Sequence, residues 1–558
     1  MKRYKRSGYI VGVTLAASLV LAACTDDSDV EEGAEADESE EEAEEEDDED
    51  DGDSDGGEEA DGEPQEGGDF LISMSGEPVS MDPHASNDNQ SAKARTLMYE
   101  TLLNHNSDTL DLETTGLAES YEQTDDDTWV FELHEGVHFH NGEELTADDV
   151  AATFDRVLEE DRGSEAAFLF EMIESTEAVD DYTVEITTEF PFAPLPAHLA
   201  HNAAGIMSEA AIEEDEAGDI NLEIEGVGTG PFIFEEWNQG DSLTVTKNED
   251  YWGEEAYLDS VTFEIVGEDL TRVSMLENNE THVADLIQPN LVEQVEALDN
   301  AHLIAEPSLS LTYVGFNTEK EPFDDVRVRQ AISLAVDNEL LVDGVYDGYG
   351  EAAYGPINEL VFGYDDDLED IGYDPEEAEE LLAEAGYEDG FETTLWMNDD
   401  NPVREQTSEL IQDQLADIGV DVSLENVEWG AYLDQTAEGE HDMFVLGWVT
   451  VTGDADYGMY SLFHSDNFGA PGNRSFYENE EVDDLLDEAR EEEDEETREE
   501  LYSEIQQILV DEAPMIYTVF DELRVGVADS AENFIQHPNG TWDLSETYIT
   551  EEAEVDGY

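Results

Sequence analysis

The sequence predicts a mixed α/β protein whose folded body divides into two or more lobes. Alternating apolar and polar residues, typical of strands, occur at 128–133, 182–187, 243–247 and 261–266. Apolar residues at helical spacing predict helices over 326–336, 375–385, 407–418 and 482–512. These segments mix along the chain, and a body of some 490 residues (69–558) exceeds what one hydrophobic core normally supports. We therefore expect several lobes, with a ligand cleft between them.

The composition supports a folded protein and excludes several functions. Of 558 residues 39% are hydrophobic, which is enough for a substantial core. The chain has 151 acidic and 18 basic residues and a net charge of −133, so nucleic acid and anionic membranes would be repelled. With one cysteine, no internal disulfide and no cysteine-rich metal site is possible.

The first 24 residues have the layout of an export signal. Basic residues stand at positions 2, 3, 5 and 6, and an apolar run covers 10–21, which is short for a membrane-spanning helix. The run ends in Leu-Ala-Ala-Cys, which resembles a bacterial lipobox and implies cleavage before Cys24 and a lipid on its sulfur. We expect a signal peptide over 1–23, in preference to a retained helix or a plain signal with a stray thiol.

An acidic tether and an acidic body follow the cysteine. Residues 25–68 contain 26 Asp or Glu and no Lys or Arg, and they lack the ordered spacing of a calcium loop, so 24–68 is expected to be a disordered, lipid-anchored tether. Residues 69–558 keep 125 acids against 14 bases, a net charge of −111. Such a surface predicts adaptation to a salty medium, because only concentrated salt screens charges this dense, and adaptation to an alkaline medium is the open alternative.

Several long motifs, in one order, resemble a known family. TWVFELHEGVHFHNGEELTADDVAATF at 128–154 is preceded by Met-Asp-Pro at 81–83 and Tyr-Glu-Thr-Leu at 99–102. VGTGPF at 227–232, KNEDYWG at 247–253, GFNTEKEPFDDVRVRQAISLAVD at 315–337 and DPEEAEELLAEAGY at 374–387 follow it. Together they resemble the peptide- and nickel-binding proteins of ATP-binding-cassette (ABC) importers, extracellular solute-binding family 5.

The resemblance implies a two-lobed fold of the periplasmic-binding-protein type, of its large class with an extra subdomain. We expect lobe I over 69–308, lobe II over 309–519 and a return to lobe I over 520–558, with two crossing segments and the ligand cleft between the lobes. The function implied is capture of a peptide outside the cytoplasm and its delivery to an ABC permease. We expect a monomer without cofactor, attached to the cell membrane only through the lipid on Cys24.

The sequence gives little support for an enzyme or for a metal-binding site. The sequence has no Gly-x-Ser-x-Gly elbow and no His-Glu-x-x-His motif. His134, His138 and His140 are spaced to share one face of a strand, but the resemblance places them in a structural strand and turn. We therefore expect a binding protein and no enzyme, and we assign no metal ligands.

The segment after the Gly-Trp pair at 447–448 indicates which class of ligand the protein binds. The resemblance implies an aspartate three positions after this pair in ordinary peptide binders, where Val451 stands here. The following Gly-Asp-Ala-Asp at 453–456 is similar to the glutathione-binding branch, in which Asp454 or Asp456 receives the ligand's ammonium. The alternative is that these residues belong to a solvated loop or cap the helix that starts near Tyr457. Trp448 and Tyr457 are expected to form cleft walls.

Cations are so scarce that an arginine in a cleft loop is informative. Arg404 lies beside the place where the resemblance puts the ligand carboxylate, and Arg474 sits in a Gly-Pro-Asn loop. Either is a candidate for a bidentate pair with a ligand carboxylate, the alternative being an ion pair with the protein's own acids. Tyr313 and Asn317, on the first crossing segment, are weaker candidates for polar contacts.

Three hypotheses stay open at this point. The first is a lipid-anchored peptide receptor, with a glutathione-like ligand preferred and short oligopeptides next. The second is a nickel or metal-chelate receptor on the same fold, and the third is a signalling or adhesion lipoprotein without transport.

Overall fold

The computed structural model describes residues 64–106, 110, 112–159, 162–399, 401–470 and 472–550. The expected signal peptide, Cys24 and nearly all of the tether lie outside these residues. The described residues belong to one compact unit. No helix among the described residues has the length and apolar character needed to cross a membrane.

One sheet of eleven strands is the framework of this unit. Its order is β15-β14-β16-β12-β17-β11-β1-β10-β9-β8, and β13 pairs with β17 off this path. The strands are β1 (Asp69–Met74), β8 (Phe232–Asn238), β9 (Ser242–Lys247), β10 (Ser260–Ile265), β11 (Val283–Ala284), β12 (Ala301–Phe316), β13 (Gly350–Ala352), β14 (Phe391–Asn398), β15 (Val420–Val427), β16 (Met443–Val449) and β17 (Met515–Ala528).

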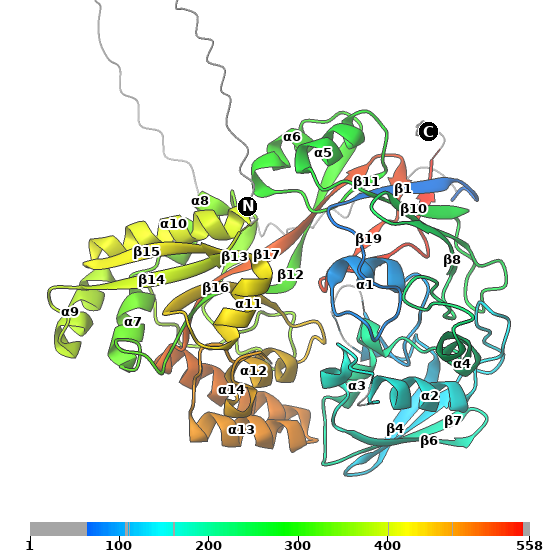
Figure 1. The fold of residues 1–558 in the computed structure, drawn as a ribbon, viewed down its shortest axis with the longest axis horizontal. Coiled ribbons are helices and arrows are strands. Elements are labelled where there is room, and N and C mark those ends of the chain that lie inside the picture. The colour runs from blue at the N-terminus through cyan, green and yellow to red at the C-terminus, as the bar shows by residue number, and fades with distance from the viewer. Residues whose placement is uncertain are drawn as a thin grey trace, which may run out of the picture. The chain divides into compact units, whose positions relative to one another are not determined.

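The two longest strands, β12 and β17, connect the two sides of the sheet. They pair antiparallel from Ala301 opposite Ala528 to Gly315 opposite Met515, with the register shifting between Pro307 and Leu311. Figure 1 shows them running through the middle of the folded unit, between the strands of 391–449 and those of 69–265. The expected lobe boundaries at 308/309 and 519/520 fall inside these two strands.

A second, four-stranded sheet lies in the N-terminal half of the folded body. Its order is β4 (Ala118–Asp125), β5 (Thr128–Leu133), β7 (Thr183–Thr188) and β6 (Ile173–Asp180). Three small two-stranded sheets pair β2 (Asn104–His105) with β3 (Leu112–Glu113), β18 (Ala531–Glu532) with β21 (Tyr548–Ile549) and β19 (Ile535–Gln536) with β20 (Trp542–Asp543).

The helices cover the sheets, as Figure 1 shows. They are α1 (Asn89–Arg95), α2 (Ala147–Val157), α3 (Leu195–Leu199), α4 (Glu209–Ala217), α5 (Asp269–Glu277), α6 (Val292–Glu296), α7 (Val326–Leu334), α8 (Asn338–Val345), α9 (Pro375–Ala385), α10 (Pro402–Asp417), α11 (Trp429–Ala437), α12 (Ala455–Phe463), α13 (Glu480–Glu491) and α14 (Glu495–Glu512). Short 3₁₀ turns are η1 (Ala167–Leu169), η2 (Asn202–Ala204), η3 (Pro289–Leu291) and η4 (Ser465–Asn467).

Local sequence explains both the correct and the wrong helix boundaries. Helix α9 matches its prediction because Asp374 caps it, Pro375 opens it and Gly386 closes it at φ +97°. The single helix predicted over 482–512 is wrong, because the chain breaks into α13 and α14. Glu492 is extended there, and the side chain of Asp494 accepts a hydrogen bond from the Thr497 backbone and caps α14.

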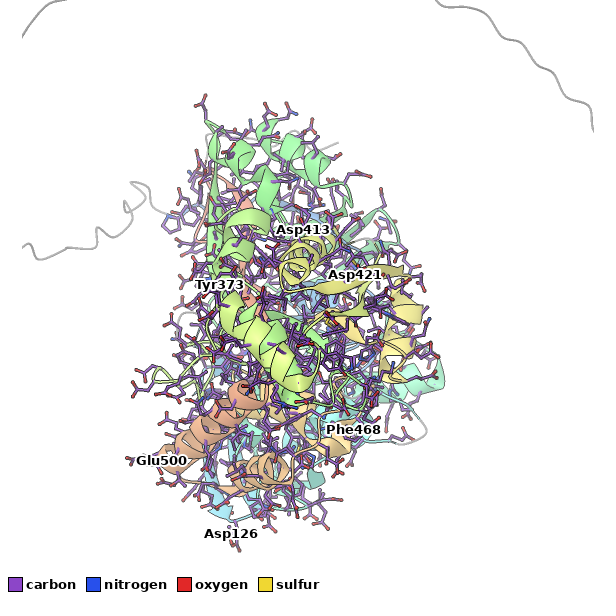
Figure 2. All side chains as sticks on the ribbon, turned by 90° about the vertical axis from the view of Figure 1, so that its left-hand side faces the viewer. Asp126, Tyr373, Asp413, Asp421, Phe468 and Glu500 are labelled. Carbon is purple, nitrogen blue, oxygen red and sulfur yellow. The ribbon has the colours of Figure 1, made fainter. Side chains whose placement is uncertain are left out.

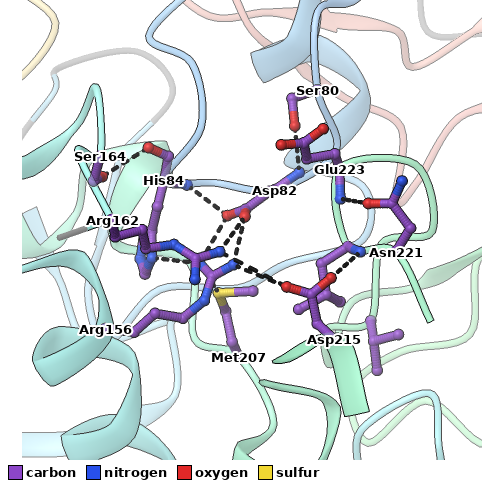
Figure 3. Close-up of polar contacts among 12 residues, drawn as sticks. Ser80, Asp82, His84, Arg156, Arg162, Ser164, Met207, Asp215, Asn221 and Glu223 are labelled. Atoms are coloured by element: carbon purple, nitrogen blue, oxygen red, sulfur yellow. Dashed lines mark hydrogen bonds and ion pairs between the residues drawn. The ribbon is translucent and has the colours of Figure 1, made fainter. Parts of the chain in front are cut away.

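A buried ion-pair network fixes the Met-Asp-Pro motif onto its neighbours (Figure 3). Asp82 accepts hydrogen bonds from Arg156 Nη1 and Nη2 at 2.9 and 2.5 Å, and Arg162 Nη2 lies 3.3 Å from the same carboxylate. Asp215, at the end of α4, lies 3.9 Å from Arg156 and 3.8 Å from Arg162. Burial alone would raise the pKa of Asp82, but Arg156 holds it well below its usual range. The network ties the loop before α1 to α2 and α4.

Acidic side chains project over the surface around this core. Figure 2 shows labelled examples from several elements, including Asp126, Asp413, Asp421 and Glu500, and all four are exposed. The negative charge counted in the sequence is therefore carried at least in part by solvent-facing side chains of the folded body.

Candidate binding cavity

A cavity of about 660 Å³ lies where residues 87–198 meet residues 448–490. Its walls include Asn87, Phe168, Glu171, Met172, Phe190 and His198 from the first segment and Trp448, Asp456, Tyr457, Tyr460, Ser461, Asn467, Ala470 and Arg490 from the second. The volume lies within the range of pockets that bind small molecules. The segment from β16 to α12, which the sequence singled out, supplies a large share of the second wall.

Asp456 places a buried carboxylate at this cavity. It lies in the first turn of α12 and is 2% exposed, and its Oδ1 atom is 3.0 Å from Arg490 Nε. Its Oδ2 atom is 3.7 Å from His198 Nε2, on the opposite wall. Burial would raise the pKa of Asp456, but Arg490, with smaller contributions from His198 and Arg498, lowers it below the usual value. The carboxylate is therefore ionised at neutral pH.

Four polar atoms of the cavity walls lack hydrogen-bond partners in the structure. Asp456 Oδ1, Arg490 Nε, His198 Nε2 and Trp448 Nε1 are all buried and make no hydrogen bond, although the first two lie 3.0 Å apart in an ion pair. Buried polar atoms normally find a partner, since leaving one unpaired costs about 1–3 kcal/mol. A cluster of such atoms around one cavity indicates a site built for a polar ligand.

Aromatic rings form the apolar walls. Trp448 and Tyr457 lie 5.3 Å apart between ring centres, and Phe168 packs on Tyr457 at 6.3 Å from the other side of the cavity. Phe168 is 43% exposed, unusual for a phenylalanine, and faces this space. Burial raises the pKa of Tyr457 to about 12, so its hydroxyl stays neutral. These rings offer flat surfaces for ligand backbone or side chains.

Asp454, the other acidic candidate, turns away from the cavity. Its side chain accepts a hydrogen bond from the Asp456 backbone at 2.9 Å and so caps α12. Arg498 Nη2 also donates to both of its oxygens, at 2.9 and 3.0 Å. With its carboxylate bound to a helix end and to an arginine, Asp454 has the capping role that the sequence left open as an alternative.

Arg404 lies outside the lining of this cavity but lacks a carboxylate partner. Its Nη1 atom donates to Asn398 Oδ1 at 2.7 Å, its guanidinium lies 5.8 Å from the centre of the Trp429 ring, and no acid of the described residues pairs with it. Gly447, beside Trp448, leaves room for it, since a Cβ there would lie 3.3 Å from Arg404 Nη2. Burial lowers the pKa of Arg404 from its ordinary value.

The other three candidates are engaged inside the protein. Arg474 Nη1 donates to the carbonyl of Gly469 at 2.9 Å, behind the cavity wall. Tyr313 is 1% exposed and packs edge-on against Phe444. Asn317 Nδ2 donates to the carbonyl of Gly439 at 3.0 Å.

Of the lining residues, the sequence predicted only Trp448, Asp456 and Tyr457, and those it missed include Arg490, His198 and Phe168. Arg490 carried a usable signal, because it is one of only 14 cations in residues 69–558. It was passed over because it stands in a predicted helix and not in a loop. His198 and Phe168 carried no local signal, since they come from a segment some 250 residues before Asp456.

The two-sided α/β fold, with a polar cavity where its halves meet, defines a solute-binding protein. The model of bacterial extracellular solute-binding proteins, family 5 Middle, matches residues 114–470. The chain belongs to this family, whose members are receptors and not enzymes, and it is the extracytoplasmic solute-binding component of an ABC importer.

Three relatives cover nearly the whole folded body. The chain is similar to the glutathione-binding protein GsiB of Pectobacterium atrosepticum, 32% identical over 494 residues, or 87% of this chain and 94% of the relative. It is similar to the oligopeptide-binding protein AppA of Bacillus subtilis, 29% identical over 566 residues, or 96% of this chain and 97% of the relative. The structure resembles the periplasmic binding protein DppA of Helicobacter pylori in complex with the peptide STSA, with a TM-score of 0.76, 31% identity and coverage of 87% and 98%.

Proposed function

We propose that this protein is a lipid-anchored receptor that captures a short peptide, a glutathione-like one preferred, and delivers it to the membrane permease. The observation that carries the proposal is the cavity of about 660 Å³, which is lined by the buried, ionised carboxylate of Asp456. A peptide brings an ammonium to such a carboxylate. The names of relatives that bind glutathione, oligopeptides and the peptide STSA support the same ligand class.

The ligand is held between the two walls. Its ammonium contacts Asp456, and its backbone packs between Trp448 and Tyr457 on one side and Phe168 on the other. Because the walls belong to different segments of the chain, a ligand that contacts both stabilises the closed form. The expected lobes, 69–308 with 520–558 and 309–519, would then close by bending the long strands β12 and β17, and the closed form docks on the permease.

Arg404 is proposed as the partner of the ligand's carboxylate. Its guanidinium makes one hydrogen bond, to an amide oxygen, and pairs with no acid of the described residues. Among the other arginines of the described residues without a carboxylate, Arg329 and Arg474 donate to backbone carbonyls. In a protein with so many acids, an arginine kept without one is well placed to receive an acid from outside.

The lipid anchor is proposed from the sequence around Cys24 alone. Replacement of Cys24 by Ala should release the protein from the membrane fraction into the medium, while the wild type stays attached. A wild-type protein found free, with an unmodified Cys24 by mass spectrometry, would contradict the anchor.

A thermal-shift screen in 2 M NaCl tests the function. We expect glutathione and some di- to pentapeptides to raise the melting temperature. Stabilisation by nickel chelates alone would overturn the peptide proposal in favour of a chelate receptor. No response to any of these ligands would favour a lipoprotein without a transport role.

A further inference from the structure

Arg490 is held at the cavity with part of its guanidinium group free. Its guanidinium carbon lies over the Tyr460 ring, 3.7 Å from the centre, and 5.0 Å from the ring centre of Phe192, a buried residue of the segment that supplies the opposite wall. Its backbone carbonyl accepts a hydrogen bond from Ala193 at 2.9 Å. Aromatic rings and backbone therefore fix its position across the junction of the two walls.

The hydrogen-bonding edges of Arg490 are left without acceptors. Its Nε atom lies 3.0 Å from Asp456 Oδ1 in an ion pair, and neither of these two atoms makes a hydrogen bond. Neither Nη1 nor Nη2 donates to any described residue. Asp456 and Arg490 thus present an acceptor and a set of donors, side by side, to the same space.

Such a pair matches one chemical group, an ammonium and a carboxylate carried by a single carbon. Ordinary α-peptides lack this group at their amino end, because the first residue's carboxylate is consumed in the peptide bond. A γ-glutamyl peptide keeps it, because the first residue is joined through its side-chain carboxyl and both α-groups stay free.

We propose that Asp456 and Arg490 together bind the zwitterionic α-amino acid head group of a γ-glutamyl peptide. Asp456 takes the α-ammonium, and the Nη1 and Nη2 edge of Arg490 takes the α-carboxylate in a bidentate pair. The inference rests on the proposed function and adds to it the chemical feature that selects the ligand. Arg490 is then a specificity-determining residue of the cavity.

A pair of isomers tests the inference directly. S-Methylglutathione and its α-linked isomer, α-Glu-(S-methyl)Cys-Gly, have the same composition and net charge and differ only in which glutamyl carboxyl forms the peptide bond. Calorimetric titration in 2 M NaCl should give at least tenfold tighter binding of the γ-linked peptide to the wild type. Arg490→Met should lower this preference to about one.

Two further variants separate a specific role from a structural one. Arg490→Lys keeps the charge and should retain part of the preference, and Arg327→Met, a surface arginine paired with Asp325 away from the cavity, should retain all of it. Melting temperatures confirm that each variant is folded.

The outcomes distinguish failure of the head-group inference from failure of the proposed peptide-receptor function. Equal binding of the isomers by the wild type, or an unchanged preference in Arg490→Met, overturns the head-group inference. If the γ-linked isomer fails to bind while other peptides bind, the inference fails and the peptide receptor stands. If no peptide binds, both fail.

Discussion

Replacing Asp82 by Asn should destabilise the folded body by about 3–5 kcal/mol, the usual cost of breaking a buried ion pair from one side. Asp82 is 2% exposed and Arg156 is 4% exposed, so the substitution leaves a buried guanidinium facing a neutral amide. The remaining acid, Asp215, is 3.9 Å away and too distant for a hydrogen bond, so it compensates little. The loss falls on the loop before α1, which the network ties to α2 and α4.

Urea denaturation at 0.5 M and 2 M NaCl measures this cost, with Asp215→Asn as the matched control. The control should lose about 1 kcal/mol or less, because Asp215 is partly exposed and makes only long contacts with the arginines. The loss of unfolding free energy in Asp82→Asn should be nearly the same at both NaCl concentrations, since salt screens buried ion pairs poorly. A loss below about 1 kcal/mol for Asp82→Asn, or equal losses for both variants, would refute the reasoning.

Three further predictions concern salt, acid and the ligand's carboxylate. The melting temperature should rise between dilute buffer and 2 M NaCl, because residues 69–558 carry a net charge of −111, and a melting temperature indifferent to salt would contradict adaptation to a salty medium. Burial lowers the pKa of His282 to about 4, so the unfolded chain takes up its proton first and stability falls from pH 6.5 to pH 4. His282→Asn should reduce that loss by about 3 kcal/mol, and an unchanged acid profile would contradict it. Arg404→Ala should weaken binding of a peptide with a free carboxyl end about thirtyfold, or 2 kcal/mol, and spare its amide, whereas equal losses for both would contradict the carboxylate pair.

The sequence predicted those features that local patterns determine. Helix α9 was predicted residue by residue, because its capping aspartate, proline and glycine are all neighbours in the chain. Trp448, Asp456 and Tyr457 were found together, since one segment carries them to the cavity wall. The role of Asp454 could not be decided, because its partner Arg498 lies 44 residues further along the chain.

The rest of the site depends on long-range packing. Arg490 lines the cavity because the end of α13 packs against the segment of Ala193, whose backbone donates a hydrogen bond to the Arg490 carbonyl. No local sequence pattern predicts this contact. The break between α13 and α14 was missed because acidic residues continue through it, and only the extended backbone of Glu492 ends the first helix. Composition predicted an acidic body, but not that a few arginines would stay without carboxylate partners.

Calorimetric titration of S-methylglutathione and of trialanine into the wild type and Asp456→Asn, in 2 M NaCl, tests the central claim most directly. The account predicts that the wild type binds at least one of these peptides and that Asp456→Asn binds it about thirtyfold more weakly or worse, as expected when a buried ammonium loses its carboxylate. Equal affinity of the two proteins for the peptide, or no binding of either peptide to the wild type, would contradict it.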